Sequence, residues 1–99
     1  MITMKGTING FSGSWGSGIG YLVIDERPVP CENGATVRAL AGAFPGFISA
    51  GHCVDNQAIA GKEIVYSVDE LGMLANFTPA EDWAGPEIPP EGLADEGEV

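Results

Sequence analysis

The sequence predicts a small, mainly β protein with one helix. Its 99 residues include 15 glycines and 7 prolines, a composition that favours turns and short strands over long helices. Several segments alternate apolar and polar side chains with the period of two that strands require, and one central segment has apolar residues at helical spacing. The length allows one domain, and a hydrophobic content of 44% is sufficient for its core.

The N-terminal segment is expected to form a strand. Ile2, Met4 and Ile8 share one parity within residues 2–11, so they would lie on one face of that strand. Residues 12–18 are serines and glycines around a single tryptophan. They predict a flexible loop, because glycine permits positive φ and serine is readily solvated.

Residues 19–25 have the strongest strand pattern in the chain, because nearly every position is apolar. We expect this segment to pair with the first strand as a hairpin. A short strand is expected around residues 29–31. Pro28 and Pro30 would make it an edge strand, since proline has no N–H to donate to a ladder.

One helix is expected at about residues 34–44. Asn33 or Thr36 could cap its start, and Pro45 with Gly46 would end it. The apolar residues that recur at helical spacing are Val37, Leu40, Ala41 and Phe44.

The C-terminal half predicts a second hairpin and then a short helix. Residues 62–68 alternate as a strand does, and residues 73–77 would be the partner strand. Residues 78–81 combine a threonine, a proline and a glutamate in the order that favours a helix start. Trp83 would dock this helix on the folded body.

Charge divides the chain into a nearly neutral body and an acidic tail. The net charge is −10, yet the four basic residues and seven acids that precede residue 80 give the body only −3. The other seven acids lie in the last 19 residues, which contain no base. Residues 85–99 are also rich in proline and glycine, a composition typical of disorder. We therefore expect a folded domain at residues 1–84 and a disordered acidic tail at residues 85–99.

The sequence gives no sign of a membrane segment or a leader. No apolar run approaches the roughly 18–20 residues that cross a bilayer, and the N-terminus lacks the apolar core of a signal peptide. A cytoplasmic location without membrane contact is therefore expected. Cys31 and Cys53 are the only cysteines, and in the cytosol they would remain thiols. Secretion would instead favour a disulfide between them.

Two stretches far apart in the sequence share a specific order of glycine and apolar residues. The opening stretch contains Gly6, Ile8, Phe11 and Ser12 followed by residues 18–22, and the closing stretch contains Gly61, Ile64, Tyr66, Val68, Ala75 and Phe77. Together they resemble the first and last strands of a cold-shock domain. The resemblance implies a five-stranded barrel of the OB type, here with the helix at about 34–44 inserted.

The chain departs from that family where the family binds single-stranded nucleic acid. Asn9 and Gly10 stand in the positions of its first-strand lysine and exposed tryptophan, and Ser17 stands where a second lysine is found. Single-strand binding needs rings on which bases stack and cations for the phosphates. The side chains that could still form such a face are Phe11, Trp15 and Tyr21 with the bases Lys5, Arg27, Arg38 and Lys62.

We expect a non-enzymatic binding module whose partner is a protein. A body of −3 with four scattered bases cannot neutralise many phosphates, which disfavours nucleic acid. The alternative is binding of single-stranded RNA or DNA through the candidate face just named.

No catalytic, metal or cofactor site is expected. Residues 47–53 resemble the histidine segment of trypsin-like serine proteases, but no Gly-x-Ser-Gly segment follows them, and the only later serine is Ser67 within a predicted strand. Cys31, His52 and Cys53 could offer metal ligands, yet adjacent residues on a strand point to opposite faces. The glycine-rich loop lacks the spacing of a phosphate-binding loop. A hydrolase is therefore only a remote alternative.

Overall fold

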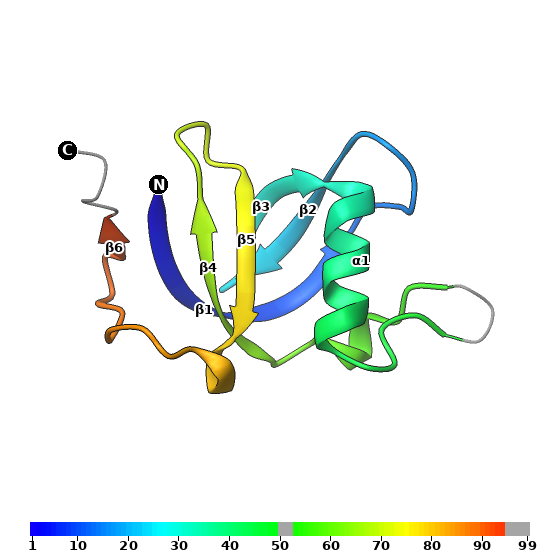
Figure 1. Cartoon of the computed structure of the whole chain (residues 1–99). Helices are drawn as coiled ribbons and strands as arrows, with labels where there is room; N and C mark the ends of the chain where they lie inside the picture. The colour runs from blue at the N-terminus through cyan, green and yellow to red at the C-terminus, as the bar shows by residue number, and fades with distance from the viewer. Residues whose placement is uncertain (50–52, 95–99) are drawn as a thin grey trace.

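The computed structural model describes residues 1–49 and 53–94 and confirms a mainly β chain with one helix. The strands and helices follow the chain in the order shown in Figure 1. The elements are β1 (Ile2–Ser12), β2 (Ile19–Ile24), β3 (Arg27–Glu32), α1 (Asn33–Ala43), the 3-10 turn η1 (Asn56–Ala58), β4 (Glu63–Val68), β5 (Leu74–Pro79), the 3-10 turn η2 (Ala80–Asp82) and β6 (Leu93–Ala94).

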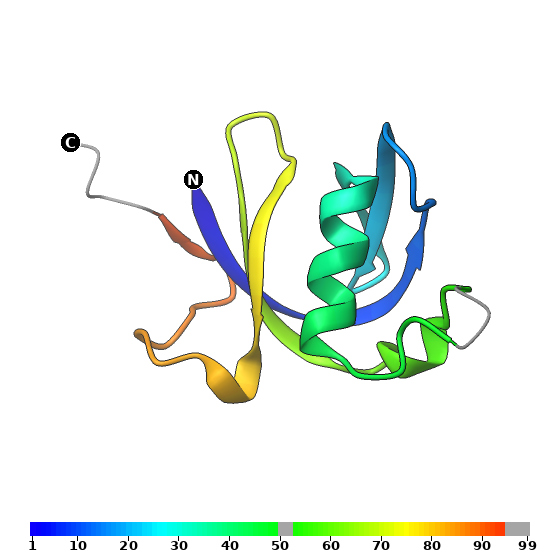
Figure 2. The same cartoon turned by 45° about the vertical axis from the view of Figure 1, so that its right-hand side comes forward.

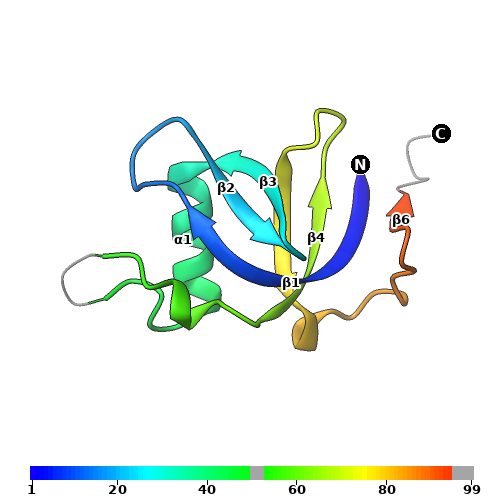
Figure 3. The ribbon, with the colours of Figure 1, turned by 180° about the vertical axis from the view of Figure 1, so that it is seen from behind.

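All strands of the described residues pair antiparallel, and β1 lies at the centre of the sheet, where it pairs with β2, β4 and β6. The sheet order is β3-β2-β1-β4-β5, with the short β6 paired to β1 as well. β1 is long and strongly curved, so its first half pairs with β4 and its second half with β2 (Figure 3). A bulge interrupts the β1–β2 register between Ile8 and Gly10. A bulge adds one residue to one strand, so even-numbered side chains of β1 face the core before it and odd-numbered ones after it. Ile8 and Phe11 therefore both face the core.

The expected closed barrel is not formed. Among the described residues no ladder joins β3 to β5, and α1 lies across this opening instead (Figures 1 and 2). The prolines of β3 give a physical reason. The two-residue turn makes Ile24 and Arg27 a hydrogen-bonded pair, so Pro28 and Pro30 fall at the positions whose backbone faces away from β2. The outer edge of β3 therefore lacks two N–H groups, and the expectation of an edge strand at this position holds.

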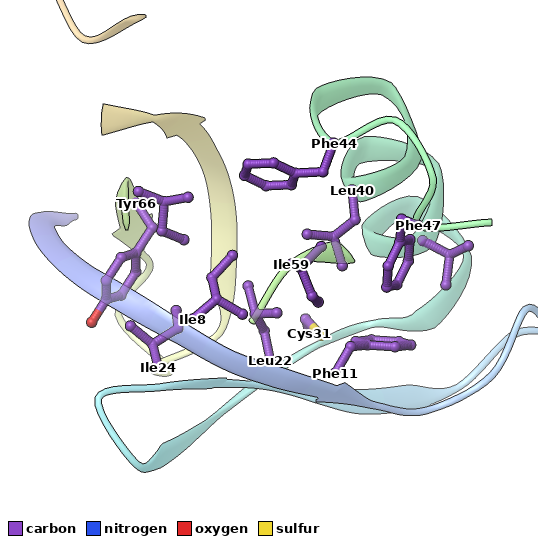
Figure 4. Close-up of a cluster of buried hydrophobic side chains, with 12 residues drawn as sticks. Ile8, Phe11, Leu22, Ile24, Cys31, Leu40, Phe44, Phe47, Ile59 and Tyr66 are labelled. Carbon is purple, nitrogen blue, oxygen red and sulfur yellow. The ribbon is translucent and has the colours of Figure 1, made fainter. Parts of the chain in front are cut away.

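The core lies between the curved sheet and α1 (Figure 4). The ring of Phe11 meets that of Phe47 edge-on, with centroids 6.2 Å apart. Phe44, at the end of α1, stacks on Phe77 of β5 with centroids 6.3 Å apart, which ties the helix to the far edge of the sheet. The buried cluster comprises Ile8, Phe11, Leu22, Ile24, Cys31, Val37, Leu40, Phe44, Phe47, Ile59, Ile64 and Tyr66.

One side chain extends the hydrogen bonding of β1 beyond the end of β4. The Asn56 amide accepts a hydrogen bond from the Phe11 N–H at 2.8 Å and donates one to the Phe11 carbonyl at 3.2 Å. An amide side chain thus occupies the place of a neighbouring strand. This pairing keeps the backbone satisfied where the sheet edge would otherwise be open.

The helix start differs from the expectation. α1 begins at Asn33, and neither Asn33 nor Thr36 acts as its cap; Glu32 stands at the cap position without a side-chain hydrogen bond. Both predicted caps are buried and serve tertiary contacts instead. The Thr36 hydroxyl bonds to the Cys31 thiol, and Asn33 bonds to the β1–β2 loop.

The C-terminal segment also differs from the expectation. Residues 78 and 79 belong to β5, so the predicted helix is reduced to the 3-10 turn η2. Disorder does not begin at residue 85, because residues 85–94 run along the sheet and end in β6 on the edge of β1 (Figure 1). Gly92 lies so close to β1 that a Cβ there would come within 2.8 Å of Ile2. Half-buried apolar side chains in this segment, including Ile88 and Leu93, explain how such a polar stretch is held.

Cys31 is a free thiol in the core and Cys53 is exposed, so no bridge joins them. Among the described residues, no helix has the length and apolarity needed to cross a membrane.

We predict that Glu26→Gly stabilises the protein. Asp25 and Glu26 both have positive φ, 52° and 66°, as a type I′ hairpin turn requires. A side chain at such a position costs about 1–2 kcal/mol, part of which glycine recovers, so the gain should be about 1 kcal/mol. Chemical denaturation measures it. Glu26→Ala is the control because it keeps the strained geometry, and an equal gain in that variant would contradict the interpretation.

We predict that stability falls as the pH rises above about 8.5, the ordinary range of a cysteine thiol, and further above about 10, that of tyrosine. Burial raises the pKa of Cys31, and burial with the nearby Asp25 carboxylate raises the pKa of Tyr66. The folded state therefore retains both protons longer than the unfolded chain, so this stabilisation is complete below the ordinary pKa values and is lost above them. The free energy of unfolding, measured across this range, should fall less steeply in Tyr66→Phe.

Candidate binding surface

Exposed apolar side chains gather along β2 and the loop that leads into it. On β2, Leu22 and Ile24 face the core, so the alternation turns Ile19 and Tyr21 outward, where they are 54% and 44% exposed. Tyr21 lies opposite Pro30 of β3. Trp15, in the loop between β1 and β2, is 46% exposed. We call Trp15, Ile19, Tyr21 and Pro30 the β2 surface.

The loop that carries Trp15 is held by Asn33. The Asn33 Oδ1 accepts a hydrogen bond from the Ser14 N–H at 3.2 Å, and its backbone N–H donates to the Gly18 carbonyl at 3.0 Å. The Asn33 side chain lies close to the backbone of both Gly13 and Gly20, because a Cβ at either glycine would overlap the Asn33 Oδ1. The loop expected to be flexible is therefore anchored to the first residue of α1.

Phe11 does not belong to this surface. Its side chain is 5% exposed and packs against Phe47 in the core (Figure 4). The expected role of Phe11 as a stacking ring is thus corrected, and the cause is the bulge that turns Phe11 inward. Trp15 and Tyr21 remain the accessible aromatic side chains of the predicted face.

The four bases of the predicted face do not come together. Lys5 pairs with Glu63 at 3.7 Å on the half of β1 next to β4, and both side chains are about half exposed. Such exposed pairs contribute little to stability. Lys62 precedes β4. Arg27 stands at the turn end of β3, about 17 Å along the strand from the Ile19 end of β2.

Arg38 is the one base near the β2 surface. A Cβ placed at Gly34 would lie 3.4 Å from the Trp15 carbonyl oxygen and 3.5 Å from the Arg38 Nη1 atom, which puts the guanidinium beside the loop. Glu32, opposite Ile19, adds an exposed acid at the same end. The surface therefore combines exposed apolar groups with one charge of each sign.

The remaining sequence candidates are divided by the fold. Phe47 of the protease-like segment 47–53 is fully buried, and His52 lies outside the described residues. The Ser67 hydroxyl is buried in β4, 2.9 Å from the Thr3 hydroxyl. Within residues 1–49 and 53–94, no three His, Cys, Asp or Glu side chains are placed to hold a metal ion.

Sequence reasoning missed two exposed apolar side chains, Ile19 on this surface and Leu71 outside it. Ile19 could have been found from its parity with Tyr21, because both alternate with Leu22 and Ile24, which face the core. Leu71, which is 84% exposed in the loop between β4 and β5, had no such signal. No family model, curated protein or solved structure matches this chain.

We predict that Asn33→Ala loosens the β1–β2 loop and destabilises the fold by about 1–3 kcal/mol, because it leaves the Ser14 N–H without its acceptor. Acrylamide quenching of Trp15 fluorescence, in a Trp83→Phe background, should rise in the variant. Gln57→Ala removes an exposed amide elsewhere and serves as the control. Unchanged quenching in Asn33→Ala would show that Asn33 does not anchor the loop.

Proposed function

We propose that this protein is a non-enzymatic module that binds a protein partner through the β2 surface. The observation that supports the proposal is the separation of exposed apolar groups from positive charge. Trp15, Ile19 and Tyr21 are each between 44% and 54% exposed, whereas three of the four bases lie elsewhere. Aromatic side chains supply much of the binding energy at protein interfaces, and an interface of this kind needs no row of cations.

We further propose that the chain is a diverged OB-type barrel related to cold-shock domains. Supporting this are the central β1 shared by two halves of the sheet, the strand order β3-β2-β1-β4-β5 and the partial opening between β3 and β5. OB folds bind ligands on the face of strands 2 and 3 and with the loops joining strands 1–2 and 4–5. Tyr21, Trp15 and Leu71 occupy those three places and are exposed.

Binding of single-stranded nucleic acid is the alternative, and one observation favours it: Trp15 and Tyr21 remain accessible for stacking, with Arg38 nearby. Two stacked bases and one cation would give weak, salt-dependent binding. The acidic C-terminal segment would repel the phosphates further.

The first experiment separates the two ligand classes. Trp15 fluorescence, measured in a Trp83→Phe background, is titrated with oligo-U and oligo-dT at low salt. We expect no quenching. Quenching that weakens with salt and disappears in Tyr21→Ala would instead support the nucleic-acid alternative.

The second experiment tests the protein-binding surface. Affinity capture is performed with the wild type, a Trp15→Ala/Tyr21→Ala variant and Ile2→Ser, which alters an equally exposed apolar residue on β1. We expect a partner that the first and third bind and the double variant loses, because each interface aromatic contributes about 2 kcal/mol, or about 30-fold in affinity. Equal capture by the wild type and both variants would contradict the proposal.

A further inference from the structure

A groove lies where the sheet fails to close. It has a volume of about 220 Å³ and runs between α1 and β5. Ala35, Thr36 and Ala39 line it from the helix, residues 74–77 line it from β5, and Glu32 stands at its end. Because the helix contributes only small side chains, the space beside β5 is left open. We call this the α1–β5 groove.

The backbone of β5 faces this groove with unpaired hydrogen-bonding groups. The Ile8 N–H donates to the Lys62 carbonyl at 2.8 Å, and this bond shows which residues of β4 direct their backbone groups toward β1. The residues that alternate with them direct theirs toward β5. By this alternation, the backbone groups of Val65 and Ser67 in β4 form hydrogen bonds with those of Thr78 and Asn76 in β5. The N–H and carbonyl of Phe77 therefore point away from β4, toward α1.

β5 is the long edge of the described sheet whose outward-facing N–H groups are not removed by proline. The other end of the sheet, β3, has prolines at its outward-facing positions 28 and 30, and a strand without these N–H groups is a poor template. The free edge of β5 has no proline before Pro79, where the strand ends.

The charge of the groove indicates the chemistry of its occupant. Glu32 is the one charged residue among those that line it, and Asp69 and Glu70 lie in the loop before β5. A second copy of this chain, at −10, would be repelled, and so would its own acidic C-terminal residues. An extended segment with positive charge and small apolar side chains is the complementary ligand.

We propose that the α1–β5 groove binds an extended basic peptide segment of a partner protein, which adds to the free edge of β5 as a strand. Backbone hydrogen bonds to Phe77 would provide register, and a small apolar side chain would enter between Ala35 and Ala39. This inference rests on the proposed protein-binding function only in that the ligand is a polypeptide. The groove meets the β2 surface at Glu32, but Trp15 and Tyr21 are not among its lining residues.

The test uses three synthetic octapeptides with the full-length protein. One alternates lysine with valine, one alternates glutamate with valine, and one keeps the lysines but has proline at the two central valines. We expect the first peptide to bind, to perturb the amide resonances of residues 74–77, and to slow amide exchange at Phe77 at least about tenfold. The glutamate and proline peptides should not bind, because the first is repelled and the second cannot form a ladder.

Variants of the helix locate the binding. Ala39→Leu fills the groove without touching the core and should weaken binding about tenfold, whereas Gly42→Leu, on the same helix but with open space around it, should not. Glu32→Gln should weaken binding about threefold. Trp15→Ala should leave peptide binding unchanged, so failure of this site and failure of the β2 surface are distinguishable.

Three outcomes would overturn the proposal: no binding of the lysine peptide up to about 1 mM, equal binding of the proline peptide, or resonance shifts confined to residues 15–21. The last result would assign the peptide to the β2 surface instead.

Discussion

The geometry of β1 is the constraint on which the rest of the fold depends. This strand pairs with β2, β4 and β6, so it must bend far enough to belong to two halves of the sheet. The bulge after Ile8 permits the bend and reverses the inward parity. Phe11 can therefore enter the core, where Phe47 packs against it, and Asn56 completes the hydrogen bonding of the backbone beyond the bulge. Without the bulge, Ile8 and Phe11 would face opposite sides.

The same features show how much of the fold the sequence predicts. Period-two alternation located the strands, and helical spacing located α1, because both patterns follow from burial on one face. Pro28 and Pro30 correctly indicated an edge. The missing ladder between β3 and β5 was not foreseen, although it follows from those prolines once the register is known. The direction of the backbone N–H and carbonyl groups of a strand depends on its register with the neighbouring strand. A local sequence pattern does not reveal that register.

The candidate surface was less predictable than the fold. The parity of Ile2, Met4 and Ile8 holds only up to the bulge. Phe11 was placed on the candidate face because it matches the cold-shock pattern, and it lies in the core instead. Asn33 was interpreted as a helix cap because that is its commonest local role. In the structure its side chain is buried and holds the Trp15 loop, a contact between segments that are separated along the chain. The C-terminal segment was misjudged by composition alone, since a few half-buried residues and one close approach at Gly92 are enough to place it.

The exposed aromatic side chains are separated from three of the four bases in this molecule, and for the two lysines the separation follows from the strands that carry them. Ile19 and Tyr21 share the outward parity of β2, whereas Lys5 lies on the half of β1 next to β4, and Lys62 precedes β4 itself. The outer surface of such a sheet can therefore change without disturbing the packing of its core, because inward and outward positions alternate along each strand.

The pairing of β6 with β1 has a consequence for folding kinetics. Leu93 and Ala94 lie opposite Thr3 and Ile2, so the first and last described strands meet at one edge of the sheet (Figure 1). This ladder joins the most distant parts of the sequence, and such non-local contacts slow folding. A circular permutant that joins the two ends would turn it into a local hairpin. With new termini in the exposed loop at residues 70–72, every ladder would be preserved while the order in which they form could change.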